Sequence, residues 1–373
     1  MHAPEPTAGS FVVSALADAK TLLASPAVGP WDGSGALQQV PGHSASAALI
    51  ARGVALRALW MWGKDRERHA RVRKIAASAL APRAIAELLG ESATLARALL
   101  TPEREDQKIE LVGEFVAPLI RQPFLAHFGV CGAQAVMLRG HFAMMAPFVR
   151  SAAVVSNDPA PYFALAAAAQ MIDKLWEGPL PREAVGARVL IDAVNAGALT
   201  RDEAISHAIL LMFGNETSVE ALAGLIARLI ERPDLRQAVA SGALAVEKLV
   251  EEGIRLGPPT NMTLVRTTTA PVDCAGMTLA AGTEIRMPLG ALNRDPCAFV
   301  DPDTFDPERD ASKHIAFGGG PSLCVGAHLA RTTLGIAIRA LVTAYPASPE
   351  ARIVRDMIRT HELGVVAIHI GTA

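Results

Sequence analysis

One long helical pattern near the middle of the chain constrains the fold most. From Asp202 to Glu231, apolar residues recur at three- and four-residue spacing, and the pattern stops before Pro233. At its centre, Leu210–Gly214 (LLMFG), the pattern is apolar on every side. A helix of this length without a polar face at its middle crosses the interior of a large domain, because other parts of the chain must cover it.

The remaining sequence predicts more helix, followed by a small β part. The expected elements are, in chain order, a strand at Ser10–Val13, a helix at Ala15–Ala24, a loop at Pro26–Ser46, helices from there to Pro258, strands at Thr263–Thr269, Val272–Cys274 and Thr283–Pro288, a helix at Val325–Ala344 and a strand pair within His361–Ile370. No repeat and no linker interrupts this order. We therefore expect a mainly α fold with a small β subdomain, formed as a single domain over residues 1–373.

Composition narrows the class of protein. Of 373 residues, 51% are hydrophobic, and 35 basic residues nearly balance 37 acidic ones, so neither nucleic acid nor an anionic membrane is indicated as a partner. The four cysteines show no metal-ligand spacing and no disulfide framework, which is typical of a reducing compartment. The N-terminal MHAPEPTAGS does not resemble a signal peptide, and the longest apolar runs are too short to span a bilayer. We expect a cytoplasmic protein without a membrane anchor.

The sharpest local signal is a glycine-rich loop that ends in a cysteine, Phe317-Gly-Gly-Gly-Pro-Ser-Leu-Cys324-Val-Gly326. Glycines allow the backbone to approach a flat ligand closely, and a cysteine just before a helix is favoured as a thiolate. A thiolate placed in this way suits haem iron. Three other interpretations remain open at this point: a phosphate loop, which would lack its Lys-Ser/Thr; a catalytic cysteine assisted by His314 or His328; or an inert cysteine.

This loop resembles the haem loop of the cytochrome P450 family, F-x-x-G-x-x-x-C-x-G. Phe317, Gly320, Cys324 and Gly326 match it in register. The resemblance implies that Cys324 is the proximal iron ligand of haem b, and that the loop, including Gly318, contacts the cofactor. Ser322 stands where the family usually has His or Arg, so one propionate contact is reduced to a neutral hydroxyl.

Two further motifs precede this loop, in the order of that family. Glu252 and Arg255 match its E-x-x-R helix motif, and at this spacing they share one helix face. By resemblance, Arg309 joins them in a buried structural network, although an isolated pair of this kind would ordinarily be a surface ion pair.

In the long helix, Gly214-Asn-Glu216-Thr217 resembles the family's oxygen-binding motif. A glycine followed by Asn weakens the helix ladder, and Thr217 can bond to an earlier carbonyl and bend it. By resemblance, Thr217 and Glu216 relay protons to bound oxygen, and Gly214 borders the substrate pocket. Phe213 stands where the family prefers Ala or Gly, and its ring either narrows the pocket or turns into the helix packing.

A basic helix, Glu67-Arg-His69-Ala-Arg71-Val-Arg73, resembles the family's H-x-R-x-R segment. His69 and Arg73 share a face and could hold a haem propionate, although a solvated basic face is the more usual meaning of such a run. By resemblance, Arg266 is a further propionate ligand.

The resemblance extends from about Phe11 to the end, without the helix and first strand that the family usually has ahead of it. It implies a monooxygenase that oxidises a small organic substrate with O2. The sequence carries no flavin or Fe–S motif, so a separate ferredoxin or flavodoxin is the expected electron donor. The alternative is a haem-thiolate protein that rearranges or binds a ligand without activating O2.

Overall fold

The computed structural model describes residues 10–30, 47–60, 66–101, 109–146, 148, 158–258, 263–345, 350–355 and 365–371. Its helices are α1 Leu16–Ala24, α2 Ala47–Ala58, α3 Arg66–Ala79, α4 Pro82–Leu99, α5 Ala117–His127, α6 Gly132–Met145, α8 Ala160–Leu175, α9 Val185–Asn195, α10 Arg201–Gly214, α11 Glu216–Glu231, α12 Pro233–Ala240, α13 Val246–Leu256, α14 Leu289–Leu292 and α15 Ala327–Ala344. A π-helical turn, Leu111–Val116, leads into α5, and short 3-10 turns lie at Ala311–Lys313 and Gly320–Ser322.

The strands form a small β part. They are β1 Ser10–Val12, β2 Val28–Pro30, β3 Ile109–Glu110, β4 Thr263–Thr268, β5 Val272–Cys274, β6 Met277–Leu279, β7 Glu284–Pro288, β8 Glu350–Arg355 and β9 Val365–Gly371. One sheet has the order β1-β7-β4-β2, a second has the order β3-β9-β8, and β5 pairs with β6. The predicted fold class, mainly α with a small β part, is confirmed. The predicted final strand pair within His361–Ile370 is wrong, because β9 pairs with β8, which lies earlier in the chain.

The long central helix is divided into α10 and α11 at Asn215. It begins with a capping box, in which the Thr200 side chain accepts from the Glu203 backbone and the Glu203 side chain accepts from that of Thr200. Every residue from Glu203 to Phe213 is buried, as the apolar sequence on all sides requires. The helix therefore crosses the protein interior.

By length and composition, the helix Arg201–Glu231 could also cross a membrane. This differs from the expectation that every apolar stretch of the sequence is too short to span a bilayer. However, 61% of its most apolar window is buried inside the protein, which is what a core helix of a folded domain shows.

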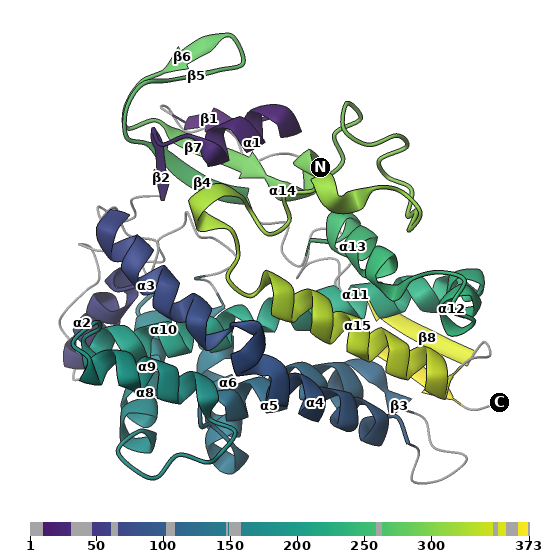
Figure 1. Cartoon of the computed structure of the whole chain (residues 1–373), viewed down its shortest axis with the longest axis horizontal. Helices are drawn as coiled ribbons and strands as arrows, with labels where there is room; N and C mark the ends of the chain where they lie inside the picture. Colours follow the sequence, from purple (N-terminus) through teal and green to yellow (C-terminus); the bar gives the residue numbers. More distant parts are fainter. Residues whose placement is uncertain are drawn as a thin grey trace.

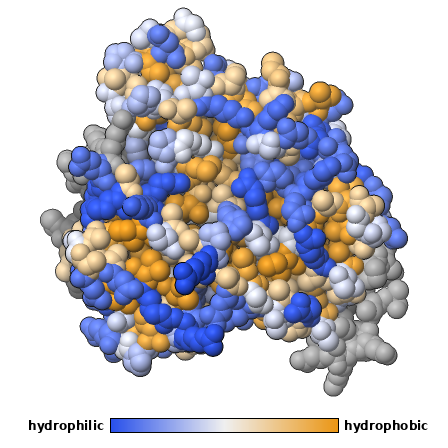
Figure 2. Space-filling view, viewed as in Figure 1, coloured by the Kyte–Doolittle hydropathy of each residue, from blue (hydrophilic) through white to orange (hydrophobic). Residues whose placement is uncertain are grey.

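The sheet β1-β7-β4-β2 and α1 gather at one end of the molecule, above the helical bulk, and the β5–β6 hairpin projects beyond them (Figure 1). The apolar residues on this face are broken up by hydrophilic ones (Figure 2). The described buried apolar side chains form three clusters. One lies around α10, one joins α4 and α5 to α11, α13 and α15, and one lies between α1 and the sheet. The cysteine loop enters between the sheet end and α15, so it sits where the β part meets the helices.

Candidate functional site

The cysteine loop is held in shape by its glycines and by α1. Gly318 and Gly320 have φ of 71° and 60°, a conformation that favours glycine. A Cβ on Gly320 would lie 2.0 Å from the Leu23 carbonyl oxygen of α1, so no larger residue fits there. The Cys324 N–H donates to the Phe317 carbonyl over 2.9 Å, which closes the loop directly before α15. Ser322 lies half-buried within the same turn.

The Cys324 side chain is accessible to solvent, although protein atoms surround the sulfur. Burial raises its pKa, while a hydrogen bond with the Gly326 backbone and the positive charges of Arg73 and Arg331 act in the opposite direction. These donors and cations would stabilise a thiolate. Among the described residues, no group of three or more His, Cys, Asp or Glu could hold a metal ion.

Three cationic or ionisable side chains, His69 and Arg73 of α3 and Arg266 of β4, gather beside this loop. Arg73 donates to the Leu323 carbonyl, next to Cys324. Burial lowers the pKa of His69, and the charges of Arg73 and Arg266 lower it further, so the three groups lie within reach of one another. Burial also lowers the pKa of Arg266 to about 10, which leaves it charged at neutral pH. No carboxylate of the described part of the chain pairs with any of them, so an acidic ligand such as a haem propionate fits this cluster.

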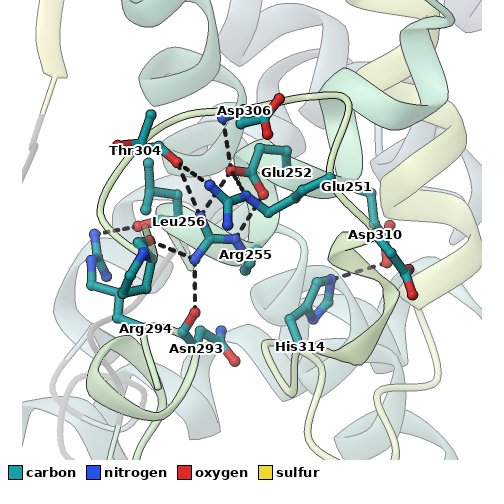
Figure 3. Close-up of polar contacts among 12 residues, drawn as sticks. Glu251, Glu252, Arg255, Leu256, Asn293, Arg294, Thr304, Asp306, Asp310 and His314 are labelled. Atoms are coloured by element: carbon teal, nitrogen blue, oxygen red, sulfur yellow. Dashed lines mark hydrogen bonds and ion pairs between the residues drawn. The ribbon is translucent and has the colours of Figure 1, made fainter. Parts of the chain in front are cut away.

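Glu252 and Arg255 of α13 form a buried ion pair (Figure 3). The Arg255 Nε and Nη2 atoms donate to Oε2 and Oε1 of Glu252 over 2.7 and 2.8 Å, and neither side chain is exposed. Arg309 Nε and the Asp306 N–H also donate to Glu252 Oε1, over 3.1 and 3.0 Å. Glu252, Arg255 and Arg309, which the sequence analysis groups together, therefore lie in one network.

Asn293 ties this network to the cysteine segment, a role that sequence reasoning missed. Its carbonyl accepts from Arg255 Nη1 over 2.8 Å, and its side-chain Oδ1 accepts from the Ile315 N–H over 2.9 Å. Arg255 donates further to the carbonyls of Pro302 and Thr304. The buried guanidinium of Arg255 therefore holds two loop segments that have no periodic sequence pattern, one at Asn293 and one at Pro302–Thr304.

The junction of α10 and α11 is open on one side. Gly214 is exposed although the eleven preceding residues are buried, and a Cβ placed on it would meet none of the described atoms within 4 Å. The Thr217 hydroxyl donates to the Gly214 carbonyl over 2.8 Å, as expected for a threonine that bends a helix. The helix break therefore leaves open space beside Gly214.

Glu216 points to α5. Arg121 Nη2 donates to its Oε2 over 2.6 Å, and Arg121 Nε lies 2.9 and 3.0 Å from its two oxygens. Asn215 of the same junction donates through Nδ2 to the Ile120 carbonyl over 2.8 Å. No local pattern in the sequence indicated either contact, because both partners lie 95 residues earlier.

The Phe213 ring turns into the packing of the helices. It is 4% exposed, and its centroid lies 5.5 Å from that of Phe142 and 6.4 Å from that of Trp60. Of the two orientations that the sequence allowed, this geometry favours the packed one. The segments 33–62, 139–161 and 258–264, which we expect to shape the pocket, lie partly outside the described residues.

Comparisons with known proteins agree with this geometry. A sequence model described as cytochrome P450 matches residues 188–369. The biotin biosynthesis cytochrome P450 of Bacillus subtilis (strain 168) is 29% identical over 74% of this chain and 71% of its own. The vitamin D(3) 25-hydroxylase of Pseudonocardia autotrophica is 34% identical over 40% of this chain and 37% of its own.

Solved structures show the same fold over nearly the whole chain. That of P450BioI in complex with an acyl carrier protein ligated to hexadec-9Z-enoic acid superimposes with a TM-score of 0.82, at 22% identity, over 97% of this chain and 92% of its own. That of tirandamycin C-bound TamI gives a TM-score of 0.74 at 25% identity, over 98% and 90%. With this fold, this family match and a cysteine loop in register, the chain belongs to the cytochrome P450 family.

Proposed function

We propose that this chain forms one domain that binds haem b through Cys324 and oxidises a small organic substrate with O2 and electrons from a separate ferredoxin or flavodoxin. The observation that carries the proposal is that an accessible thiol lies beside a cationic cluster whose charge is balanced by no carboxylate of the described residues. When bound, haem would supply the activation of dioxygen. The proposed site of action is the cytoplasm.

The residues of the cysteine side hold and tune the cofactor in this proposal. The Cys324 sulfur would be the iron ligand, and the hydrogen bond from the Gly326 N–H would limit how much electron density it gives to the iron. His69, Arg73 and Arg266 would hold the propionates, because an arginine fork and an imidazolium both suit a carboxylate. Ser322, Gly318 and Gly320 of the same loop would also contact the cofactor.

On the helix side, Thr217 and Glu216 handle protons. The Thr217 hydroxyl, which donates to the Gly214 carbonyl, would rotate to donate its proton toward the open space beside Gly214. Glu216 accepts from Arg121 through both oxygens and cannot donate in that position. Proton delivery by Glu216 therefore requires its carboxylate to leave Arg121, which places Arg121 in control of the relay.

The test is the spectrum of the ferrous carbonyl complex. With Cys324 as ligand, the wild-type protein shows the strongly red-shifted Soret band of the family, and Cys324→His loses it. Cys297→Ala, which removes another exposed cysteine, is the matched control and keeps the band. A globin-like carbonyl spectrum in folded wild-type protein would refute the proposed ligand.

A second measurement separates the monooxygenase from a haem protein that only binds or rearranges its ligand. Surrogate redox partners are supplied with NAD(P)H while compounds are screened for Soret shifts. A monooxygenase consumes NAD(P)H and O2 together with the bound compound. Product formation without NAD(P)H or O2 would favour the alternative.

A further inference from the structure

Two side chains outside the Glu252 network contact the ring of Phe317, the first residue of the cysteine loop. The guanidinium carbon of Arg331, in α15, lies 4.5 Å from the ring centroid. The ring centroid of His314 lies 6.0 Å from it, at an interplanar angle of 47°. A guanidinium over an aromatic face is attracted by the ring electrons. Because the Phe317 carbonyl accepts from the Cys324 N–H, these contacts act on a residue that closes the loop.

One carboxylate, that of Glu251 in α13, anchors both of these groups. Arg331 Nε and Nη2 donate to Oε2 and Oε1 of Glu251 over 2.6 and 2.7 Å, in a bidentate pair. His314 Nε2 lies 3.0 Å from Oε1. Figure 3 shows Glu251 and His314 beside the Glu252 network. Glu251 therefore connects α13, α15 and the segment that leads into the cysteine loop.

The protonation of this cluster follows from its hydrogen bonds. His314 Nδ1 accepts from the Ala316 N–H over 3.1 Å, and His314 Nε2 lies 3.0 Å from Glu251 Oε1. Burial would raise the pKa of Glu251, but the two hydrogen bonds from Arg331, with His314 close by, outweigh burial and hold that pKa at about 2. The carboxylate is ionised at neutral pH and compensates the charge of Arg331.

We propose that Glu251 is a positioning residue of the haem-thiolate site: it holds Arg331 against Phe317 and offsets the Arg331 charge near Cys324, and it thereby lowers the reduction potential of the bound iron. The inference rests on the proposed ligation by Cys324. Reduction adds one electron to the iron, so a positive charge near the sulfur stabilises the reduced form and a negative charge opposes it. The pair of Glu251 and Arg331 leaves little net charge there.

The experiment compares the reduction potentials of Glu251→Gln, Arg331→Gln and the double variant, measured by spectroelectrochemical titration. Glu251→Gln leaves the Arg331 charge uncompensated, and the potential rises. Arg331→Gln leaves the Glu251 charge uncompensated, and the potential falls. The double variant returns close to the wild type. The expected shift of each single variant is on the order of tenfold in the ferrous-to-ferric ratio, about 59 mV for a one-electron couple.

The same two helices supply a matched control. Arg339 of α15 pairs with Glu247 of α13, and the side chains of this pair are 58% and 72% exposed. Glu247→Gln and Arg339→Gln make the same changes of charge on the same elements, away from Phe317. We expect both to keep the wild-type potential, because exposed charges are screened by solvent.

The outcomes distinguish this inference from the proposed function. A wild-type carbonyl spectrum without the thiolate band refutes ligation by Cys324, and the inference falls with it. With that band present, shifts of the same sign in both single variants indicate loosened packing and overturn the role of Glu251 alone, as do shifts equal to those of the control pair. Should Glu251→Gln fail to retain haem, the remaining variants decide, because Arg331→Gln must have a lower potential than the double variant.

Discussion

Breaking the buried pair of Glu252 and Arg255 should remove a large part of the stability of the fold. Glu252→Ala deletes four hydrogen bonds to the carboxylate, two from Arg255 and one each from Arg309 and the Asp306 backbone. It leaves the Arg255 guanidinium charged, wholly buried and surrounded by backbone carbonyls. Loss of one partner of a buried ion pair costs about 3–5 kcal/mol, against a total of about 5–15 kcal/mol for a typical domain.

The structure also orders related variants. Arg255→Ala removes the same pair and in addition its donors to Asn293, Pro302 and Thr304, so it should destabilise at least as much as Glu252→Ala. Arg309→Ala leaves the central pair intact and should cost about 1.5–3 kcal/mol, the range for a hydrogen bond to a charged group. Replacing both ions with Glu252→Met and Arg255→Leu should cost less than the sum of the single changes, because no unpaired charge remains.

Urea unfolding followed by circular dichroism measures these differences without reference to catalysis. Glu247→Ala on the same helix is the control, because its exposed pair should contribute at most about 1 kcal/mol. An unfolding midpoint of Glu252→Ala equal to that of this control would show that the pair does not hold the fold. Additive effects in the double variant would refute the claim that the unpaired charge is the main cost.

The remaining predictions concern the distal helix and acid stability. Thr217→Ala should retain haem and consume electrons while product per electron falls and peroxide rises; unchanged coupling would show that protons arrive by another route. Phe213→Ala should lower the free energy of unfolding by about 3–5 kcal/mol, because it removes a ring packed between Trp60 and Phe142. The same variant should change the affinities of a graded series of iron-ligating azoles little. A selective gain in affinity for the bulkiest azoles would show that the ring lines the pocket. Burial lowers the pKa of His207 from 6.5 to about 4, so the unfolded protein binds the proton first and the free energy of unfolding falls as the pH drops from about 6.5 to 4. The slope of the free energy of unfolding against pH is at most about 1.4 kcal/mol per pH unit for this group. This slope should decrease in His207→Leu, and an unchanged slope would refute the assignment to His207.

The helical part of the fold was predictable wherever the sequence pattern is local. The apolar period defined α10 and α11, and it stopped before Pro233 as observed. The break between them has a local component, the bond from Thr217 to Gly214, which the sequence suggested. Its other component, Asn215 bonded to the Ile120 carbonyl, depends on how α5 packs and leaves no trace in the pattern. Similarly, β8 could not be located from the tail, because its register is set by pairing with β9.

For the candidate site, motif spacing identifies candidate residues but not their partners. The i, i+3 spacing put Glu252 and Arg255 on one face, and the structure places them in contact. Glu216 was grouped with Thr217 because they are adjacent, whereas its carboxylate is bound by Arg121 of a different helix. Asn293 had no readable chemistry in the sequence, because its role lies in two hydrogen bonds to segments 38 residues before it and 22 residues after it.

Two consecutive glutamates of α13 show that a sequence motif can include one residue of a site and omit its neighbour. Neighbouring residues on a helix point about 100° apart, so Glu251 and Glu252 meet different surroundings although the sequence presents them as one acidic pair. Glu252 faces Arg255 and Arg309, and Glu251 faces Arg331 and His314. The family motif includes only Glu252, yet Glu251 reaches the cysteine loop through fewer contacts. Because both carboxylates are carried by one helix, any rotation of α13 would disturb the support of the loop and the charge beside its sulfur together.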